Sequence, residues 1–158
     1  MVCMDKENFV DWQSLIDEAH EKLVGEKAKR IRIPWKIVGD RETSLPTSIV
    51  NQGGIYAIWI DGIVRYIGEA LKIQSRLRTH IIYASRNPAT NTGTESKLSR
   101  VLKAKEQKQK IEVSFVVVQP VSLRLLLEEE VIHKVDKDNK DHKERALWNT
   151  HAKVQKKK

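Results

Sequence analysis

The chain has 158 residues, of which 40% are hydrophobic, and a formal net charge of +8 at pH 7. This length is typical of one domain that buries its own core, and the positive charge favours an anionic partner such as nucleic acid. No stretch approaches the ~20 apolar residues of a membrane helix, and no signal-peptide core follows the polar first residues. The single cysteine, Cys3, excludes a disulfide framework and a cysteine-rich zinc site. We therefore expect a single cytoplasmic domain, residues 1–158, with no membrane association.

The first third of the chain, residues 1–52, is expected to be an appendage packed on a core that spans residues 53–151. Apolar residues recur at helical spacing from about Phe9 to Val24, which predicts an N-terminal helix. Residues 33–38 are predicted as an edge strand because Pro34 cannot donate a hydrogen bond to a neighbouring strand.

Two runs rich in β-formers, residues 55–60 and 63–67, flank Asp61-Gly62 and predict a β-hairpin. Both faces of this hairpin are apolar, so we expect a sheet that is covered on both sides. A third, central strand is predicted over residues 111–119.

Three further helices are predicted at about residues 71–84, 95–109 and 122–137, with a polar loop at 85–94 and a basic tail at 152–158. Together these elements predict an α+β domain with a small, mainly antiparallel three-stranded sheet flanked by helices.

The residues that best indicate a chemical function are two tripeptides, Gly54-Ile55-Tyr56 and Tyr66-Ile67-Gly68, followed by Arg76 and His80. Arg76 and His80 are four residues apart and project from the same face of the predicted helix. Two strand tyrosines on their own would be read as core residues with a hydrogen-bonded hydroxyl. Both tripeptides, their short spacing and the downstream arginine together resemble the GIY-YIG nuclease family, over about residues 53–151.

The resemblance implies a role for each of these side chains. Tyr56 would receive a proton from the attacking water, Tyr66 would contact phosphate or water, and Arg76 would contact the scissile phosphate. His80 would position the water or the phosphate, although a surface histidine with satisfied hydrogen bonds remains the alternative. Because a phenol has a pKa near 10, Tyr56 needs nearby cations to act as a base, and the final proton acceptor stays open.

The register of the hairpin decides whether the two tyrosines meet. A simple two-residue turn would place Tyr56 and Tyr66 on opposite faces, since strand side chains alternate. We therefore expect a three-residue loop with Gly62 in the left-handed region, pairing Trp59 with Ile63 and Tyr56 with Tyr66.

Glu128 is the predicted metal ligand. It lies in an expected apolar stripe of Leu125, Ile132 and Val135, where a carboxylate is costly without a metal or a cation. The segment also resembles the family's glutamate helix, which implies that Glu128 is the single protein ligand of Mg²⁺ (or Mn²⁺). A shift of one residue in the helix phase would favour Glu129 instead.

Asn149 resembles the late asparagine with which the family braces its active site. Glu69 departs from the family, in which a lysine commonly follows the second glycine, and Lys72 or Arg78 could substitute for that lysine. We expect basic side chains along the chain to contact DNA, namely Lys72, Arg78, Lys97, Lys103 and Lys105.

The resemblance implies an endonuclease that acts on double-stranded DNA and leaves 5′-phosphate and 3′-hydroxyl ends. The compact hairpin, the polar insertion at 85–94 and the Trp148-Asn149 pair favour the phage type that degrades host DNA. A type II restriction endonuclease and a non-catalytic DNA-binding protein are the alternatives. Cutting two strands favours two paired active sites, hence a homodimer or homotetramer.

Overall fold

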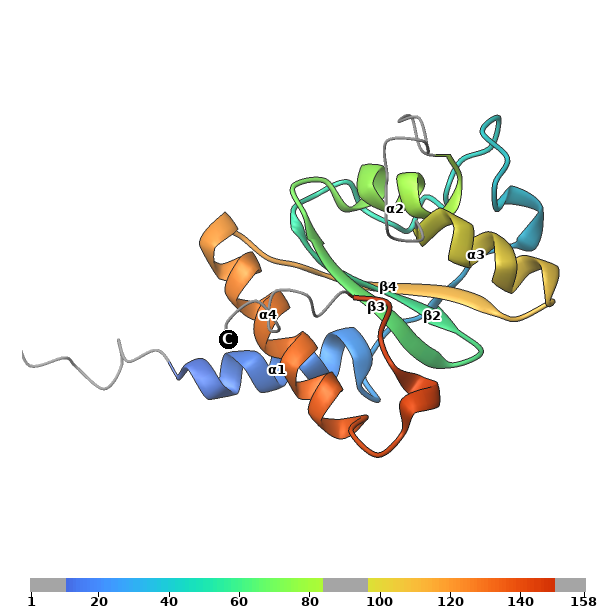
Figure 1. Ribbon diagram of the computed structural model, residues 1–158. Coiled ribbons are helices and arrows are strands. Elements are labelled where there is room, and N and C mark those ends of the chain that lie inside the picture. Colours follow the sequence, from blue (N-terminus) through green and yellow to red (C-terminus); the bar gives the residue numbers. More distant parts are fainter. Residues whose placement is uncertain (1–10, 84–96, 150–158) are drawn as a thin grey trace, which may run out of the picture.

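The computed structural model describes residues 11–83 and 97–149, which form an antiparallel four-stranded sheet between two layers of helices (Figure 1). The strand order is β1-β4-β2-β3. The strands are β1 (Ile31–Arg32), β2 (Gly54–Ile60), β3 (Ile63–Ala70) and β4 (Ile111–Val117). The α+β class is as expected, but the sheet has four strands rather than three because β1 from the N-terminal segment pairs with β4.

Each face of the sheet is covered by two helices (Figure 1). One face carries α1 (Trp12–Val24) and α4 (Val121–Asp138), and the other carries α2 (Ile73–Ile81) and α3 (Lys97–Glu106). Two short 3-10 helices, η2 (Trp35–Ile37) and η4 (Lys143–Arg145), complete the described elements. The loop predicted at 85–94 lies outside the described residues. Within residues 11–83 and 97–149, no helix is both long and apolar enough to span a bilayer.

Strand β2 is buried along its whole length and divides the core into two halves. Ile55, Ala57 and Trp59 pack toward α1 and α4, whereas Tyr56, Ile58 and Ile60 pack toward α2 and α3, in a single alternating pattern. The expectation of a sheet covered on both sides is confirmed.

The hairpin turn differs from the predicted three-residue loop. Ile60 pairs with Ile63 across a two-residue turn in which Asp61 and Gly62 have φ values of 52° and 78°. The register then shifts, so that Trp59 pairs with Val64 and Ile58 pairs with Tyr66. Arg65 is therefore the extra residue of a β-bulge, and this bulge, rather than the turn, brings Tyr66 to the face of the sheet that carries Tyr56.

The predicted edge strand over residues 33–38 is also wrong. Strand β1 ends at Arg32, and Pro34, with φ fixed at −63°, precedes the 3-10 helix η2. Ile33 and Val38 are buried in the half of the core below α2 and α3. The stretch expected to be an appendage thus supplies side chains to the main core.

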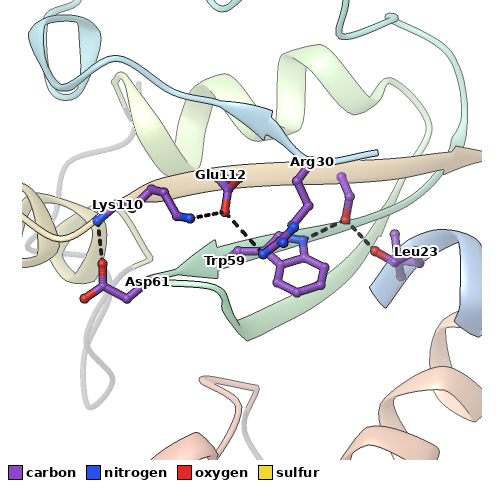
Figure 2. A network of polar contacts seen from close by, with 7 residues as sticks. Leu23, Arg30, Trp59, Asp61, Lys110 and Glu112 are labelled. Carbon is purple, nitrogen blue, oxygen red and sulfur yellow. Dashed lines mark hydrogen bonds and ion pairs between the residues drawn. The ribbon is translucent and has the colours of Figure 1, made fainter. Parts of the chain in front are cut away.

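A polar network fixes this N-terminal segment onto the sheet (Figure 2). The indole N–H of Trp59 donates to the Ser114 hydroxyl at 2.9 Å, and this hydroxyl donates to the Leu23 carbonyl at 2.6 Å. On the same indole lies the guanidinium of Arg30, 4.8 Å from the ring centre and paired with Glu112. Because Trp59 and Ser114 are buried, these bonds hold α1 in a defined position on β2 and β4.

The buried line of α4 consists of Arg124, Leu127, Val131 and Val135, not the predicted stripe, because Leu125 is 48% exposed. The period of the pattern was correct but its phase was off by one residue. Glu128 lies one turn after Arg124 and is half-buried beside this line. The helix begins at Val121, directly after Pro120.

Candidate active site

Three aromatic side chains from three elements converge on the α2 side of the sheet. Tyr56 comes from β2, Tyr66 from β3 and His80 from α2, and their ring centres are 5.5 to 6.0 Å apart. The Tyr56 hydroxyl lies 2.8 Å from His80 Nε2. The structure thus brings together three of the residues that the sequence singled out.

Gly68 makes room for this cluster. It pairs with Tyr56 across the hairpin. A Cβ at this position would lie 2.5 Å from the Tyr56 hydroxyl and 3.0 Å from a ring carbon of Tyr66. The glycine of the second tripeptide is therefore required by space rather than by backbone conformation.

Both phenols are held in their protonated form. Burial raises the pKa of Tyr56 well above its usual value, with the neighbouring Tyr66 adding to the shift. The pKa of Tyr66 is raised by burial and by the negative charge of Glu128. Arg76 acts in the opposite direction on both phenols but does not prevail. Arg76, one of the cations expected to lower the pKa of Tyr56, does so but is outweighed by burial.

His80 is a neutral imidazole at physiological pH. Burial, followed by the positive charges of Lys97 and Arg76, lowers its pKa from 6.5 to about 3. Lys97 comes from α3, and its ammonium lies 5.0 Å from the centre of the Tyr66 ring. It was predicted as a DNA contact, and nothing in the sequence placed it at the tyrosines, since only the fold brings α3 to this face.

Arg76 and Glu128 act on the cluster from its rim. Arg76 is exposed on α2, and its charge affects the pKa of Tyr56, Tyr66 and His80. Glu128 belongs to α4, yet its charge raises the pKa of both tyrosines, so its carboxylate lies within electrostatic range of them. In the described parts of the chain no group of three or more His, Cys, Asp or Glu side chains could hold a metal ion. A single carboxylate near the tyrosines is compatible with Mg²⁺, which keeps several waters and takes one or two protein carboxylates.

Asn149 braces the strand that carries Tyr66. Its side-chain amide donates to the Ile67 carbonyl at 2.7 Å, and its side-chain oxygen accepts from the Ile67 N–H at 3.1 Å. One residue earlier, the Trp148 N–H donates to the Arg65 carbonyl. The Trp148 backbone and the Asn149 side chain thus occupy backbone groups on the outer side of β3.

A buried ion pair that the sequence did not reveal joins β3 to α4. Arg124 Nε lies 3.3 Å from Glu69 Oε2, and the arginine side chain is only 2% exposed. A Cβ on Gly53 would lie 2.8 Å from Arg124 Nη1. Glu69, which departs from the family pattern, is thus the partner of a buried cation one turn before Glu128. The sequence signal for this ion pair is Arg124 on the apolar line of α4. It was missed because the predicted helix phase was off by one residue.

The remaining predicted DNA contacts divide into two groups. Arg78 donates to the carbonyls of Thr43 at 2.7 Å and Arg41 at 2.9 Å, and Lys105 donates to the Val38 carbonyl at 3.0 Å. Both side chains hold the segment that follows η2. Lys72 and Lys103, in contrast, are exposed.

No protein-family model and no curated protein matches the sequence. Among solved structures the chain is similar to GIY-YIG endonuclease domains. A point mutant of the N-terminal endonuclease domain of UvrC from Thermotoga maritima, bound to its catalytic divalent cation, aligns with a TM-score of 0.42 and 23% identity, over 65% of this chain and 88% of that chain. The same domain bound to magnesium aligns with a TM-score of 0.41, 24% identity and the same coverage. A mutant of bacteriophage T4 EndoII aligns with a TM-score of 0.41 and 19% identity, over 57% of this chain and 63% of that chain.

Proposed function

We propose that this protein is a divalent-metal-dependent DNA endonuclease with its active site at Tyr56, Tyr66 and His80. The observation that carries the proposal is the 2.8 Å contact between the Tyr56 hydroxyl and His80 Nε2, beside the cations Arg76 and Lys97. A proton-accepting pair next to two positive charges suits an attacking water and an anionic phosphodiester. The resemblance of the tripeptides and the downstream arginine to GIY-YIG nucleases implies the same roles for these side chains and so supports the proposal.

Tyr56 and His80 form a proton relay in this proposal. With its pKa raised, Tyr56 keeps its proton and donates it to the neutral Nε2 of His80. As the water attacks phosphorus, its proton passes to the Tyr56 oxygen while the Tyr56 proton passes to His80. The phenolate that would be unstable in this buried site never accumulates, and His80 is the final proton acceptor.

Substrate binding would make His80 a better base. Two of the three causes that lower its pKa are the positive charges of Lys97 and Arg76. A phosphodiester bound at these cations offsets their charge, so the pKa of His80 rises toward the range in which an imidazole accepts a proton. Arg76 would hold the phosphate through its planar guanidinium, which presents several donors to phosphate oxygens.

Glu128 is the residue that would hold a divalent ion. The ion would stabilise negative charge on the phosphoryl oxygens and on the leaving 3′ oxygen. Such a reaction would leave 5′-phosphate and 3′-hydroxyl ends.

The finer assignment is a nuclease of the phage type that degrades host DNA, with a sequence-specific restriction enzyme as the second candidate. Cutting both strands would use a homodimer or homotetramer, and α4 offers exposed apolar side chains for such a contact: Val121, Leu125 and Leu126. Light scattering measures the assembly, and sequencing of the cleaved ends separates a recognition site from broad degradation.

The test compares Glu128→Gln with Glu129→Gln, a matched control because Glu129 is exposed on the adjacent face of α4. Supercoiled plasmid is incubated with the wild type in the presence and absence of Mg²⁺, and the variants are measured in single-turnover cleavage. Binding is measured in Ca²⁺. Glu128→Gln should lose at least ~10³-fold in rate with unchanged or tighter binding, because a negative charge near the phosphate is removed. Glu129→Gln should cut as the wild type does.

Binding of the wild-type protein without cleavage in any divalent metal would instead support the non-catalytic DNA-binding protein. Arg76→Ala adds an independent check, since it should weaken both binding and cleavage.

A further inference from the structure

A second concave surface lies beside the tyrosine cluster, where α3 faces the β2–β3 hairpin and η4. This pocket encloses about 450 Å³. Its lining combines three cations with an indole ring: Arg65, Arg100, Lys103 and Trp148. None of the roles proposed above for cleavage uses this pocket.

The β-bulge places Tyr66 on the same side of the sheet as Arg65, which lines the pocket. In a regular strand, Arg65 and Tyr66 would project from opposite faces. Here Arg65 lines the pocket together with residues of α3, and Lys97 of α3 lies over the ring of Tyr66. Arg65 and Tyr66 therefore both face α3, because the extra residue of a bulge lets two consecutive side chains lie on one face of the sheet. The same strand thus serves the tyrosine cluster and the pocket next to it.

Two guanidinium groups lie beside the same indole in this pocket. Those of Arg65 and Arg100 lie 5.9 and 5.7 Å from the centre of the Trp148 ring. Burial and then the charge of Arg100 lower the pKa of Arg65, as expected for like charges in proximity. Half-buried like charges are unfavourable, and an anion between them removes the cost.

Arg65 has little internal compensation for its charge. Its Nη1 donates to the Glu144 carbonyl at 3.2 Å, while its buried Nε has no hydrogen-bond partner within the described residues. The two acidic side chains at the pocket are engaged elsewhere. The Asp61 carboxylate accepts from the Lys110 N–H at 2.7 Å, and that of Glu144 lies 3.4 Å from His142.

The pocket continues a line of cations that begins at the tyrosine cluster. Lys97, Arg100 and Lys103 are three residues apart and form one ridge of α3. Successive members are separated by roughly 4.5 Å along the helix axis. If a strand with its scissile phosphate at Lys97 and Tyr66 runs along α3, a neighbouring phosphate comes near Arg100 and Lys103.

We propose that the pocket formed by Arg65, Arg100, Lys103 and Trp148 binds a backbone phosphate of the substrate strand that flanks the scissile phosphate. The proposal rests on the nuclease function for the identity of the strand. A phosphate held there would add a second fixed point for the strand next to the tyrosine cluster.

The test measures how binding of a short duplex depends on salt, by fluorescence anisotropy in EDTA so that no cleavage interferes. Arg100→Gln and Lys103→Gln are compared with Lys137→Gln, an exposed lysine in the last turn of α4. Each lost phosphate contact lowers the slope of log affinity against log salt by ~0.9. Both pocket variants should show this decrease and Lys137→Gln should not. Unchanged slopes in both pocket variants would overturn the proposal, and the exposed Lys103 keeps the test valid if Arg100→Gln folds poorly.

A second arm locates the phosphate. Once the cut has been mapped, duplexes are prepared with a single neutral methylphosphonate linkage at each of the positions next to it. One flanking linkage should weaken binding by the wild type but not by Arg100→Gln. If every linkage affects both proteins equally, the pocket does not hold a flanking phosphate.

Inorganic phosphate distinguishes a free anion from DNA. If it binds the wild type and not Arg100→Gln while the DNA salt slopes stay equal, the pocket takes a free anion and the proposal is wrong. These outcomes are separate from the fate of the nuclease function, because binding is measured without catalysis. A protein that shows the slope change but never cuts plasmid retains the phosphate pocket and loses the nuclease assignment.

Discussion

Neutralising Glu69 should destabilise the protein far more than neutralising an exposed glutamate. In Glu69→Gln the buried Arg124 loses its charged partner, and its side chain is only 2% exposed. Removing one member of a buried ion pair costs roughly 3–5 kcal/mol. Glu69 is itself 26% exposed, so water compensates in part and we expect about 3 kcal/mol. With a urea slope of about 2 kcal/mol per molar, the unfolding midpoint should fall by about 1.5 M.

The matched control is Glu18→Gln, whose partner Lys22 forms an exposed pair on α1 with 53% and 59% exposure. Exposed pairs contribute about 0–1 kcal/mol, so this variant should unfold close to the wild-type midpoint. Arg124→Met should cost less than Glu69→Gln, because the carboxylate left behind can be rehydrated. The double variant should recover part of the stability lost in Glu69→Gln. If the two glutamine variants unfold at the same urea concentration, Arg124 does not depend on Glu69 and the reasoning is refuted.

Three further predictions concern the tyrosine cluster. Gly68→Ala should reduce single-turnover cleavage while leaving duplex affinity in Ca²⁺ intact, because a Cβ there would displace the Tyr56 hydroxyl. Between about pH 3 and 6.5, His80 is protonated in the unfolded state but not in the folded state. The free energy of unfolding should therefore rise with pH by up to about 1.4 kcal/mol per unit, and His80→Gln should flatten this dependence in urea titrations. Asn149→Ala should cost about 1–3 kcal/mol and speed amide hydrogen exchange at Ile67, whereas unchanged exchange would contradict the bracing role.

Local patterns were sufficient for the elements that are amphipathic over several turns. The stripe of Ile73, Leu77 and Ile81 predicted α2, and the apolar runs around Asp61-Gly62 predicted the hairpin. The tripeptides within it carry the resemblance to the GIY-YIG family. These predictions hold because the patterns lie within short stretches of the sequence and the tertiary contacts agree with them.

The parts that could not be predicted depend on contacts between distant residues. Strand β1 forms because it pairs with β4, and with only two residues it is too short to show the alternating pattern of a strand in the sequence. The bulge at Arg65 could not be predicted from the sequence. The observed two-residue turn with its bulge and the expected three-residue loop both place Tyr56 and Tyr66 on the same face of the sheet. The helix phase of α4 was predicted wrongly because a charged residue, Arg124, was not expected at a core-facing position. The pKa of Tyr56 depends on burial that the sequence does not show.

The pairing of Trp148 and Asn149 with β3 has a consequence for how this protein can associate. An open strand edge is a template onto which another chain can add a strand, which leads to sheet extension or aggregation. Here Trp148 and Asn149 occupy the backbone groups of Arg65 and Ile67 on one outer edge. The opposite outer strand, β1, is two residues long. Release of the segment around Asn149 would therefore expose unpaired backbone groups of β3 beside Tyr66, to which another strand could add.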